Sequence, residues 1–353
     1  MPQLLDTAQL LAALDEGMTV LDTRSPGEYE QGHVVGAKSL PLFDNAERAL
    51  VGTTYKQVDP RAALLEGLDI VGPKMRSLVE QAEQLCAMDA KTKRSPRVGV
   101  YCWRGGSRSA SLAWLLETAG FEVMRLRGGY KAYRQRARAY LDELPFRFYV
   151  VDGSTGSGKT VLLHALQAAG AQVLDLEGIA NHKGSAFGLT PGQEQPTTEQ
   201  AENEIYAQLR GFDPAQPVWV ENESRNIGRV FLPDGIIAGL AQGHRVEIEV
   251  PEEDRIDHIV SQYGRYPRAV LADTFHHLRK RLGGKATQEA VAAVDAGDLA
   301  SAARIALGYY DKAYAHYSDR QGHPSSERHA VRFAELESLA TQLHRTSRAE
   351  TSS

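Results

Sequence analysis

The amino-acid sequence predicts an α/β protein made of two parallel-sheet domains, with a mostly helical segment at its C-terminal end. The length of 353 residues suits two domains better than one. In both halves, short apolar runs typical of buried strands alternate with runs of helical periodicity, which favours parallel sheets. From Pro251 onward the pattern is almost wholly helical. We expect a first domain over residues 1–144, a second over 145–250, and a helical extension of the second over 251–353.

The first domain is predicted from three strands and two helices. We expect strands in MTVLDTR, RVGVYC and FEVMRL, at residues 18–24, 97–102 and 121–126. Helical periodicity in SASLAWLLETAG ends at Gly120, a typical C-terminal stop. A basic helical run then reaches Leu144, directly before Pro145. Because a helix generally ends before a proline, the domain boundary is placed there.

The second domain opens with the strand FRFYVVDG at residues 146–153 and the helix KTVLLHALQAAG at 159–170. AQVLDLE, PVWVENE and HRVEIEV are predicted as further strands, with helices between them. The C-terminal extension carries helical runs such as DTFHHLRKRLGG and SAARIALGYYDKAYAHY. The polar end, residues 345–353, is expected to be frayed.

Composition excludes several classes of protein. Hydrophobic residues make up 42% and charged residues 24%, as in ordinary globular proteins, so extensive disorder is not expected. The apolar runs are shorter than the ~20 residues that a membrane-spanning helix needs, and the acidic N-terminus does not resemble a signal peptide. Two cysteines cannot build a disulfide framework or a four-cysteine zinc site. We therefore expect a cytoplasmic protein that does not interact with membranes.

One stretch of the chain is strongly basic although the net charge is −5. Between Lys91 and Arg138 there are 12 Lys and Arg residues, against Glu117 and Glu122 as the acids. Such a run is often a solvated helical face. It is also the pattern of a surface that binds phosphate-rich RNA, where Lys and Arg supply most of the affinity. Both interpretations stay open from composition alone.

A cysteine loop follows the second predicted strand. Cys102 begins the segment CWRGGSRS, directly before a helix, and the segment places Arg104, Gly105, Gly106 and Arg108 around the thiol. The glycines let backbone N–H groups turn inward, and the helix N-terminus and both arginines add positive charge. These surroundings favour a thiolate near neutral pH, or the anion of a persulfide or selenide. Cys86, in EQLCAM, fits a buried inert thiol instead.

The N-terminal region resembles a rhodanese domain over about 140 residues. The resemblance rests on several separate segments in the expected order: DTR at 22–24, Glu28-Tyr29, GHVVGAKSLP at 32–41, the cysteine loop, and LRGGYKAY at 126–133. In that family the matching cysteine carries transferable sulfur or selenium. The spacing Cys-x5-Arg also suits the phosphate chemistry of tyrosine phosphatases. Those enzymes usually have His before the cysteine, where this chain has Tyr101.

A phosphate-binding loop opens the second domain. The segment GSTGSGKT matches G-x-x-x-x-G-K-[ST], between a predicted strand and a predicted helix. Its backbone N–H groups would wrap a phosphate chain, Lys159 would neutralise charge, and the Thr160 hydroxyl suits Mg²⁺. ATP and GTP are the default ligands, although any diphosphate meets the same geometry. The residues of this predicted P-loop are Gly153, Ser154, Thr155, Gly156, Ser157, Gly158, Lys159 and Thr160.

Polar residues that follow two other strands are candidates to support this loop. Because the ends of parallel strands share one edge of a sheet, Asp175 and Glu177 are expected near Glu221 and Glu223. Either pair could hold Mg²⁺ or orient a substrate, and a plain surface or capping role is equally open. Ser224 and Arg225 continue the second loop and are candidate phosphate contacts. The ligand set of any metal is not predicted.

The two modules together resemble the tRNA 2-selenouridine synthase family across essentially the whole chain. Further matching segments are LDLEG at 174–178, Asn181-His182 and ENESRNIG at 221–228. The resemblance implies action on wobble 2-thiouridine in the anticodon loops of lysine, glutamate and glutamine tRNAs. It implies S-geranylation by geranyl diphosphate, then replacement of the geranylthio group by selenium from selenophosphate, which its own synthase supplies. Cys102 would carry the selenium as Cys–S–Se⁻, and no tightly bound cofactor is implied.

Under this interpretation the basic run becomes a candidate tRNA surface. Its candidate contacts are Arg134, Arg136 and Arg138, with Arg265 and Arg268 as a second group. Two other functions remain open from the sequence. One is a rhodanese-linked ATP-dependent sulfurtransferase or kinase, and the other is a non-catalytic RNA-binding module. Neither Cys102 nor Lys159 would be needed in a scaffold, which argues against the last of these.

Overall fold

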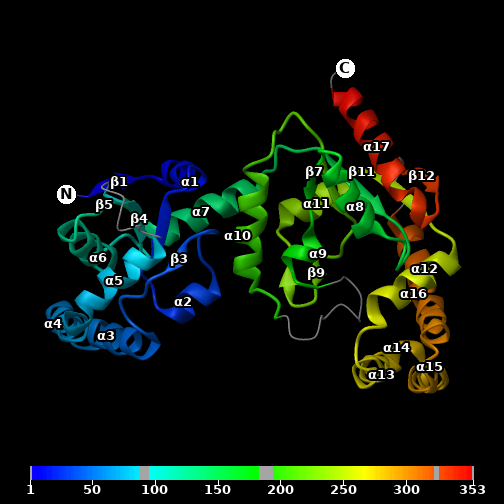
Figure 1. The fold of residues 1–353 in the computed structure, drawn as a ribbon, viewed down its shortest axis with the longest axis horizontal. Coiled ribbons are helices and arrows are strands. Elements are labelled where there is room, and N and C mark those ends of the chain that lie inside the picture. Colours follow the sequence, from blue (N-terminus) through cyan, green and yellow to red (C-terminus); the bar gives the residue numbers. More distant parts are fainter. Residues whose placement is uncertain (1, 87–94, 183–193, 322–325, 352–353) are drawn as a thin grey trace. The chain divides into compact units, whose positions relative to one another are not determined.

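The computed structural model describes residues 2–86, 95–182, 194–321 and 326–351. The chain forms two compact units, which are coloured along the sequence in Figure 1. Unit 1 contains residues 1–140 together with 202–207, and unit 2 contains residues 141–201 and 208–353. The division at Tyr140 lies close to the boundary expected at Leu144, and the helical C-terminal segment belongs to unit 2.

Unit 1 is built on a parallel sheet of five strands in the order β1-β5-β4-β2-β3. The strands are β1 (Gln3–Leu5), β2 (Thr19–Asp22), β3 (Lys38–Ser39), β4 (Arg97–Tyr101) and β5 (Glu122–Leu126). Buried aliphatic residues of β2, β4 and β5 pack with α5 and α6 into one core. The helices are α1 (Thr7–Asp15), α2 (Pro26–Gln31), α3 (Asn45–Gln57), α4 (Pro60–Val71), α5 (Met75–Leu85), α6 (Ser107–Thr118) and α7 (Gly129–Asp142).

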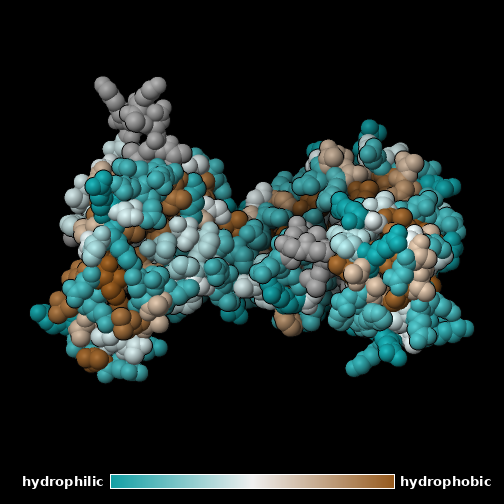
Figure 2. Space-filling model, turned by 60° about the horizontal axis from the view of Figure 1, so that its bottom comes forward, coloured by the Kyte–Doolittle hydropathy of each residue, from teal (hydrophilic) through white to brown (hydrophobic). Residues whose placement is uncertain are grey.

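Helices α3, α4 and α5 were not predicted, although α3 and α4 begin at clear capping signals. Asp44 accepts a hydrogen bond from the Glu47 amide in a capping box, and Asp59 caps α4 ahead of Pro60. Apolar side chains on these two helices face solvent, and Figure 2 shows brown surface at this end of unit 1. The exposed residues there are Leu50, Tyr55, Val58, Leu64, Leu65 and Leu68.

Unit 2 has its own parallel sheet of five strands, in the order β12-β11-β6-β8-β7. The strands are β6 (Phe148–Asp152), β7 (Gln172–Leu174), β8 (Val218–Glu221), β11 (His244–Glu249) and β12 (Ser326–Ala330). Helices α8 and α17 pack on this sheet around buried Trp219. The helices are α8 (Lys159–Ala168), α9 (Leu176–Ile179), α10 (Thr198–Leu209), α11 (Asp234–Gln242) and α17 (Leu336–Thr351), and β9 (Asn226–Ile227) pairs with β10 (Val230–Phe231).

Five helices between β11 and β12 form the helical segment expected from the sequence. They are α12 (Glu252–Tyr263), α13 (Arg268–His277), α14 (Arg279–Leu282), α15 (Gly284–Ala296) and α16 (Leu299–Gln321). One expectation for the C-terminal region was wrong: the polar end is not frayed, because α17 continues to Thr351 with Ser347 buried. The mostly helical segment also contains one strand, since residues 326–330 form an edge strand beside β11. The strand SERHA is polar because it lies at an edge, so it lacks an apolar run.

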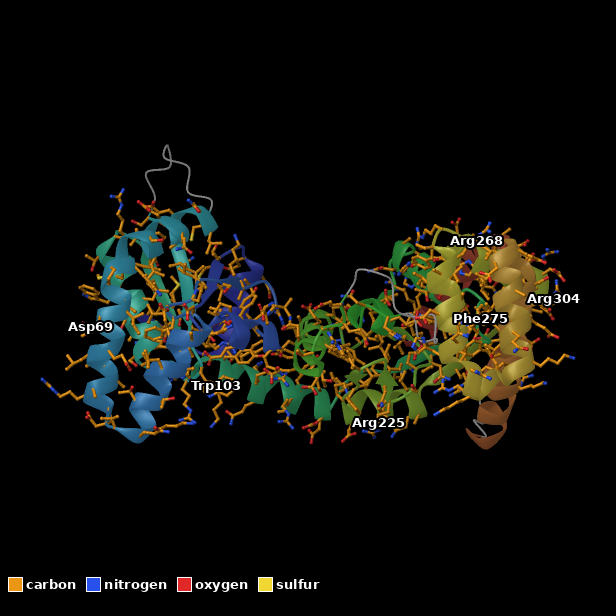
Figure 3. The ribbon with its side chains drawn as sticks, turned by 90° about the horizontal axis from the view of Figure 1, so that it is seen from below. Asp69, Trp103, Arg225, Arg268, Phe275 and Arg304 are labelled. Carbon is orange, nitrogen blue, oxygen red and sulfur yellow. The ribbon has the colours of Figure 1, made fainter. Side chains whose placement is uncertain are left out.

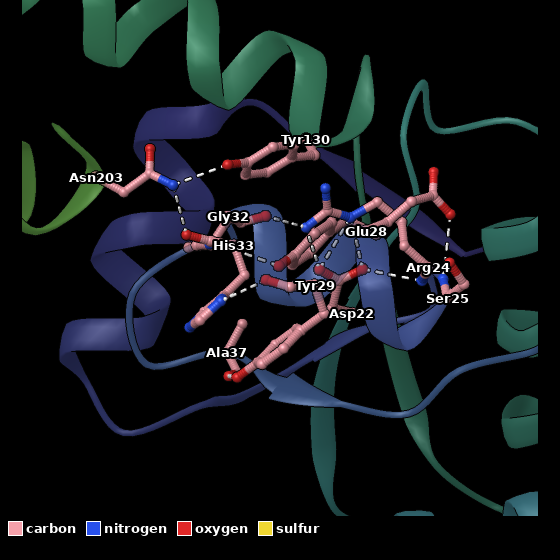
Figure 4. A network of polar contacts seen from close by, with 12 residues as sticks. Asp22, Arg24, Ser25, Glu28, Tyr29, Gly32, His33, Ala37, Tyr130 and Asn203 are labelled. Carbon is pink, nitrogen blue, oxygen red and sulfur yellow. Dashed lines mark hydrogen bonds and ion pairs between the residues drawn. The ribbon is translucent and has the colours of Figure 1, made fainter. Parts of the chain in front are cut away.

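A buried ion pair organises the loop that follows β2. Asp22 is fully buried and receives two hydrogen bonds from Arg24 Nε, each 3.0 Å long (Figure 4). The Arg24 guanidinium also donates to the Gly32 carbonyl at 2.7 Å and lies 3.8 Å from the centre of the Tyr130 ring. Burial acts to lower the pKa of Arg24, but its bonds to Asp22 raise that pKa overall.

Replacing Arg24 with methionine should strongly destabilise unit 1, because Asp22 would keep a buried charge without a partner. Removing one partner of such a pair typically costs about 3–5 kcal/mol of unfolding free energy. Urea unfolding followed by circular dichroism measures the change. Arg76→Met is the control, since Arg76 pairs with Glu80 on the exposed surface and should change little. Equal midpoints for the two variants would contradict the structural role of the Asp22–Arg24 pair.

Candidate active site

The predicted cysteine loop joins β4 to α6 in unit 1. Cys102 follows the last residue of β4, and the residue is 3% exposed, so its side chain is recessed. Gly129, at the start of α7, has a φ of 62°, and a Cβ there would lie 2.2 Å from the Cys102 carbonyl oxygen. The glycine therefore lets α7 begin directly against the cysteine loop. This close approach gives a structural reason for the glycines of the LRGGY segment at residues 126–130, which lies against the cysteine loop.

The surroundings of Cys102 favour its thiolate. Burial acts to raise the pKa of the thiol, but hydrogen bonds from Ser109, the charge of Arg108 and the Arg104 backbone N–H lower it overall. The Ser109 Oγ atom lies 3.3 Å from the sulfur. The expected anion-stabilising loop is thus present, and it includes the hydroxyl of Ser109, which was not among the predicted site residues. The sequence feature that could have identified Ser109 is its place in the first turn of the helix that follows the cysteine loop.

The two arginines of the loop differ in their surroundings. Arg108 is held by Glu28 of α2, with a 2.7 Å distance between Arg108 Nη1 and Glu28 Oε2. Arg104 is exposed at the loop surface, and Gly105 and Gly106 accept hydrogen bonds from Arg125 through their carbonyl oxygens. Glu28 belonged to the rhodanese-like pattern without an assigned role. In the structure it positions the cation that acts on the thiol.

The two cysteines should therefore differ in their response to pH. The pKa of Cys102 is lowered, whereas burial raises the pKa of Cys86, so Cys102 has more thiolate at any given pH. Alkylation by iodoacetamide, followed for each cysteine by mass spectrometry, should reach half its limiting rate at a lower pH for Cys102. Ser109→Ala should move that midpoint upward, and the remote Ser77→Ala should not. A lower midpoint for Cys86 than for Cys102 would contradict this reading of the loop.

The P-loop connects β6 to α8 in unit 2, as the sequence predicted. Lys159 Nζ donates to the Gly153 carbonyl at 3.0 Å, which places the ammonium over its own loop. Asp152, at the end of β6, accepts from the Gly153 amide at 2.8 Å and forms a 2.6 Å ion pair with buried Arg245 of β11. This pair anchors the start of the loop to the neighbouring strand. Arg245 was not recognised from the sequence, because nothing local distinguishes it from other strand residues.

Three carboxylates meet at the start of α8. Thr160 Oγ1 donates to Glu177 Oε2 at 3.2 Å, and the Glu177 amide donates to Glu221 Oε1 at 2.8 Å. Burial and then the nearby Glu177 raise the pKa of Glu221 well above its usual range and that of Glu223 to about 7, although Lys159 acts to lower the latter. The expected convergence of Glu177, Glu221 and Glu223 is therefore observed. Such a cluster of acids needs a nearby cation or bound protons.

The other predicted supporting residues have structural partners. Asp175 caps α9 by accepting from the Gly178 amide, and it lies 3.2 Å from His164 Nε2. The Ser224 hydroxyl donates to the Asn226 carbonyl at 2.8 Å. Arg225 forms a 2.6 Å ion pair with exposed Asp234, and Figure 3 shows it at the surface of unit 2. Ser224 nevertheless lines the cavity next to the P-loop.

The oxygen donors beside the P-loop fit Mg²⁺. Glu221 Oε2 is buried without a hydrogen-bond partner, and Thr160 and Glu177 lie in the first turns of α8 and α9. In the described part of the chain there is no group of three or more His, Cys, Asp or Glu residues arranged as a metal site. Mg²⁺ commonly takes only one or two protein ligands and completes its shell with water and substrate phosphate. Thr160 and Glu177 are the residues that would hold it here.

A cavity of about 700 Å³ opens beside the P-loop within unit 2. One part is lined by P-loop residues together with Glu177, Asn222, Glu223 and Ser224. The rest is lined by helices α12, α13, α15 and α16, mainly through apolar side chains. This cavity was not predicted, because its wall is assembled from four separate helices.

The candidate tRNA contacts differ in how free their side chains are. Arg134 forms an ion pair with Glu202 and donates to the Asn203 side chain at 2.7 Å. Arg136 and Arg138 are exposed, and Arg136 Nε donates to the Tyr206 hydroxyl at 3.2 Å. Arg268 donates to the Asp295 carbonyl at 2.9 Å, and the Arg265 guanidinium lies 6.0 Å from the centre of the Tyr266 ring.

Part of the predicted basic surface, and the expectation about membranes, can be compared with the structure as follows. Lys91, Lys93 and Arg94 of the basic run lie outside the described residues. Among the helices that are described, none has the length and apolar character that crossing a membrane requires.

Comparisons with known proteins match both parts of the chain. The rhodanese-like domain family matches residues 6–136, and the tRNA 2-selenouridine synthase AAA domain family matches residues 146–332. A tRNA 2-selenouridine synthase of Aeromonas salmonicida (strain A449) is 34% identical over 310 residues, which are 82% of this chain and 81% of the relative. One of Cronobacter sakazakii (strain ATCC BAA-894) is 32% identical over 352 residues, covering 90% and 91%. A solved rhodanese-related protein from Thermoplasma volcanium covers 38% of this chain and 92% of its own, with 16% identity and a TM-score of 0.23.

The two family matches follow one another along the chain. The range matched by the rhodanese-like family contains the cysteine loop, and the range matched by the second family contains the P-loop. The chain is an enzyme that belongs to the tRNA 2-selenouridine synthase family.

Proposed function

We propose that the protein converts wobble 2-thiouridine of tRNA into 2-selenouridine in two chemical steps. In the first, the 2-thio sulfur attacks C1 of geranyl diphosphate, a C–S bond forms, the C–O bond breaks and pyrophosphate leaves. In the second, the selenium of selenophosphate attacks C2 of the base, the C2–S bond breaks, and sulfur leaves with the geranyl group as geranylthiolate. Water then attacks phosphorus, the P–Se bond breaks, and phosphate leaves, so that 2-selenouridine remains.

The observation that carries this proposal is the presence of two anion-binding loops with different chemistry. Cys102 has a lowered pKa and lies in a loop that favours an anionic chalcogen. The P-loop offers backbone N–H groups and Lys159 to a diphosphate, whose departure as pyrophosphate is assisted by electrostatic stabilisation. Mg²⁺ bound at Thr160 and Glu177 would neutralise further charge on the leaving group. Neither loop needs ATP hydrolysis for this work.

Mass spectrometry of tRNA nucleosides tests the proposal. Thiolated tRNA incubated with the protein and geranyl diphosphate alone should gain the mass of one geranyl group. Addition of selenophosphate should then yield 2-selenouridine, with no requirement for ATP. An absolute ATP requirement would instead favour a rhodanese-linked ATP-dependent sulfurtransferase or kinase, which the P-loop sequence also permits.

We further propose that the substrates are the tRNAs for lysine, glutamate and glutamine, contacted through the exposed arginines of α7. Phosphate contacts make affinity fall with rising salt concentration. Replacing Arg136 and Arg138 together by alanine should flatten the plot of log affinity against log salt by about 0.7–0.9 for each lost contact. Arg134 is better left unchanged, because its pair with Glu202 gives it a structural role.

Filter-binding titrations at several salt concentrations measure this slope. They should be repeated with an Arg61→Ala/Arg76→Ala double variant, which removes two exposed arginines of α4 and α5. This control changes the net charge by the same amount as the Arg136→Ala/Arg138→Ala variant. If both double variants have the slope of the wild-type protein, the tRNA surface lies elsewhere, with Arg265 and Arg268 as the next candidates.

A further inference from the structure

The cavity beside the P-loop shares a wall with the loop itself. Arg255 of α12 donates through Nε to the Thr155 carbonyl at 2.9 Å and forms a 2.6 Å ion pair with Asp311 of α16. Gly156 has a φ of 79°, and a Cβ there would lie 2.8 Å from Ile259 Cδ1 on α12. Phosphates on the loop would therefore lie directly beside the helical wall, with no separating layer of side chains.

The helical part of the cavity is mostly apolar, and its polar lining residues are His258, Gln262, Tyr263 and Tyr310. Small residues Ala302, Ala303 and Ala306 line one side on α16, and they belong to the buried cores of the helical segment. Phe275 of α13 lies among these helices in Figure 3, whereas Arg304 is on the outside, paired with Glu252 and Glu253. The remaining apolar lining residues are Ile259, Val260, Leu271, Val294, Leu299 and Leu307.

We infer that this apolar chamber, formed by α12, α13, α15 and α16, binds the hydrocarbon chain of a diphosphate whose phosphates lie on the P-loop. Cavities of a few hundred cubic ångströms suit small ligands, and this one continues past the space that a diphosphate needs. A nucleoside there would bury the polar groups of its base and ribose mostly against apolar side chains, which is unfavourable for each group that lacks a hydrogen-bond partner. A chain of carbon atoms gains from the same surface.

This inference rests on the proposed function, because it assigns the prenyl chain of geranyl diphosphate to a specific place. It also makes a separate claim about selectivity. Each additional methylene buried in an apolar site should tighten binding by about fourfold. The length of the chain, as well as its diphosphate, should therefore determine affinity. Ala306 and Phe275 both line this chamber. The sizes of their side chains, one small and one large, would therefore limit the length of the hydrocarbon chain that fits.

Calorimetric titration of the whole protein with three probes tests the inference: inorganic pyrophosphate, dimethylallyl diphosphate and geranyl diphosphate. For the wild-type protein, Kd should fall by on the order of 100-fold or more from the five-carbon to the ten-carbon compound. Ala306→Leu should weaken geranyl diphosphate at least 10-fold while leaving pyrophosphate within about twofold. Ala300→Leu, an exposed position on the same helix, should leave all three affinities unchanged.

Retained pyrophosphate binding shows that Ala306→Leu has kept its fold. Phe275→Ala supplies a second variant, which should shift preference toward the fifteen-carbon farnesyl diphosphate. Equal wild-type affinities for the three probes, or unchanged geranyl diphosphate binding in both variants, would overturn the inference even if tRNA is geranylated. Chain-dependent binding without any geranylation of thiolated tRNA would leave the chamber assignment standing and reject the proposed reaction.

Discussion

Replacing Cys102 by alanine should abolish selenium incorporation into tRNA while leaving the fold and tRNA binding nearly unchanged. The thiol is the group that the loop's hydrogen bonds and Arg108 stabilise as an anion, and alanine removes it without adding bulk. The side chain is small, so its loss should have only a modest effect on stability even though it is buried. The 2-selenouridine content of tRNA after incubation, measured by mass spectrometry, gives the result.

Cys86→Ala is the matched control, because it removes the other cysteine of the chain. Cys86 lies at the end of α5 with a raised pKa, so its replacement should be silent in the same assay. Selenation by Cys102→Ala at the rate of the wild-type protein would exclude Cys102 from the selenium-transfer step. A loss of tRNA binding in that variant would show that the cysteine acts through structure instead.

Replacing Lys159 by alanine should slow geranylation by about 10²–10³-fold. One well-placed group that stabilises developing charge is typically worth about that factor in rate, and Lys159 lies over the loop expected to hold the diphosphate. Selenation of tRNA that already carries the geranyl group should be much less affected, because pyrophosphate has left by then. The two half-reactions are measured separately, each with and without ATP.

Lys285→Ala controls for the loss of one positive charge, since Lys285 is exposed on α15. It should leave both rates unchanged. Inorganic pyrophosphate should compete with geranyl diphosphate in the wild-type protein, and ATP should stimulate neither step. If Lys159→Ala slows both half-reactions equally and both require ATP, the P-loop serves a nucleotide-dependent reaction and does not bind geranyl diphosphate as proposed.

The parts of the molecule that could be predicted are those whose structure is decided by neighbours in the chain. The P-loop and the cysteine loop each lie between a strand and a helix, and their glycines and flanking apolar runs are local signals. The strand alternation likewise predicted both parallel sheets. By contrast, β12 owes its conformation to its pairing with β11, and SERHA contains no strand pattern by itself.

The features that were missed depend on residues far apart in the sequence. Arg108 is positioned by Glu28, 80 residues earlier, and Asp152 by Arg245, 93 residues later. Arg134 was predicted as a tRNA contact, but residues 202–207 belong to unit 1 and Glu202 pairs with Arg134. The apolar chamber draws on four helices whose periodicity indicates burial without showing that their buried faces enclose a space.

The most direct test of the two-step account is to compare the products of Cys102→Ala and Lys159→Ala on the same tRNA. Each variant is incubated with thiolated tRNA, geranyl diphosphate and selenophosphate, and again with tRNA that is already S-geranylated. We expect Cys102→Ala to accumulate S-geranyl-2-thiouridine and to make no 2-selenouridine from either tRNA. Lys159→Ala should make 2-selenouridine only from the geranylated tRNA. If Lys159→Ala fails on both tRNAs, or Cys102→Ala accumulates no geranylated product, the two loops do not divide the reaction between them and the account is wrong.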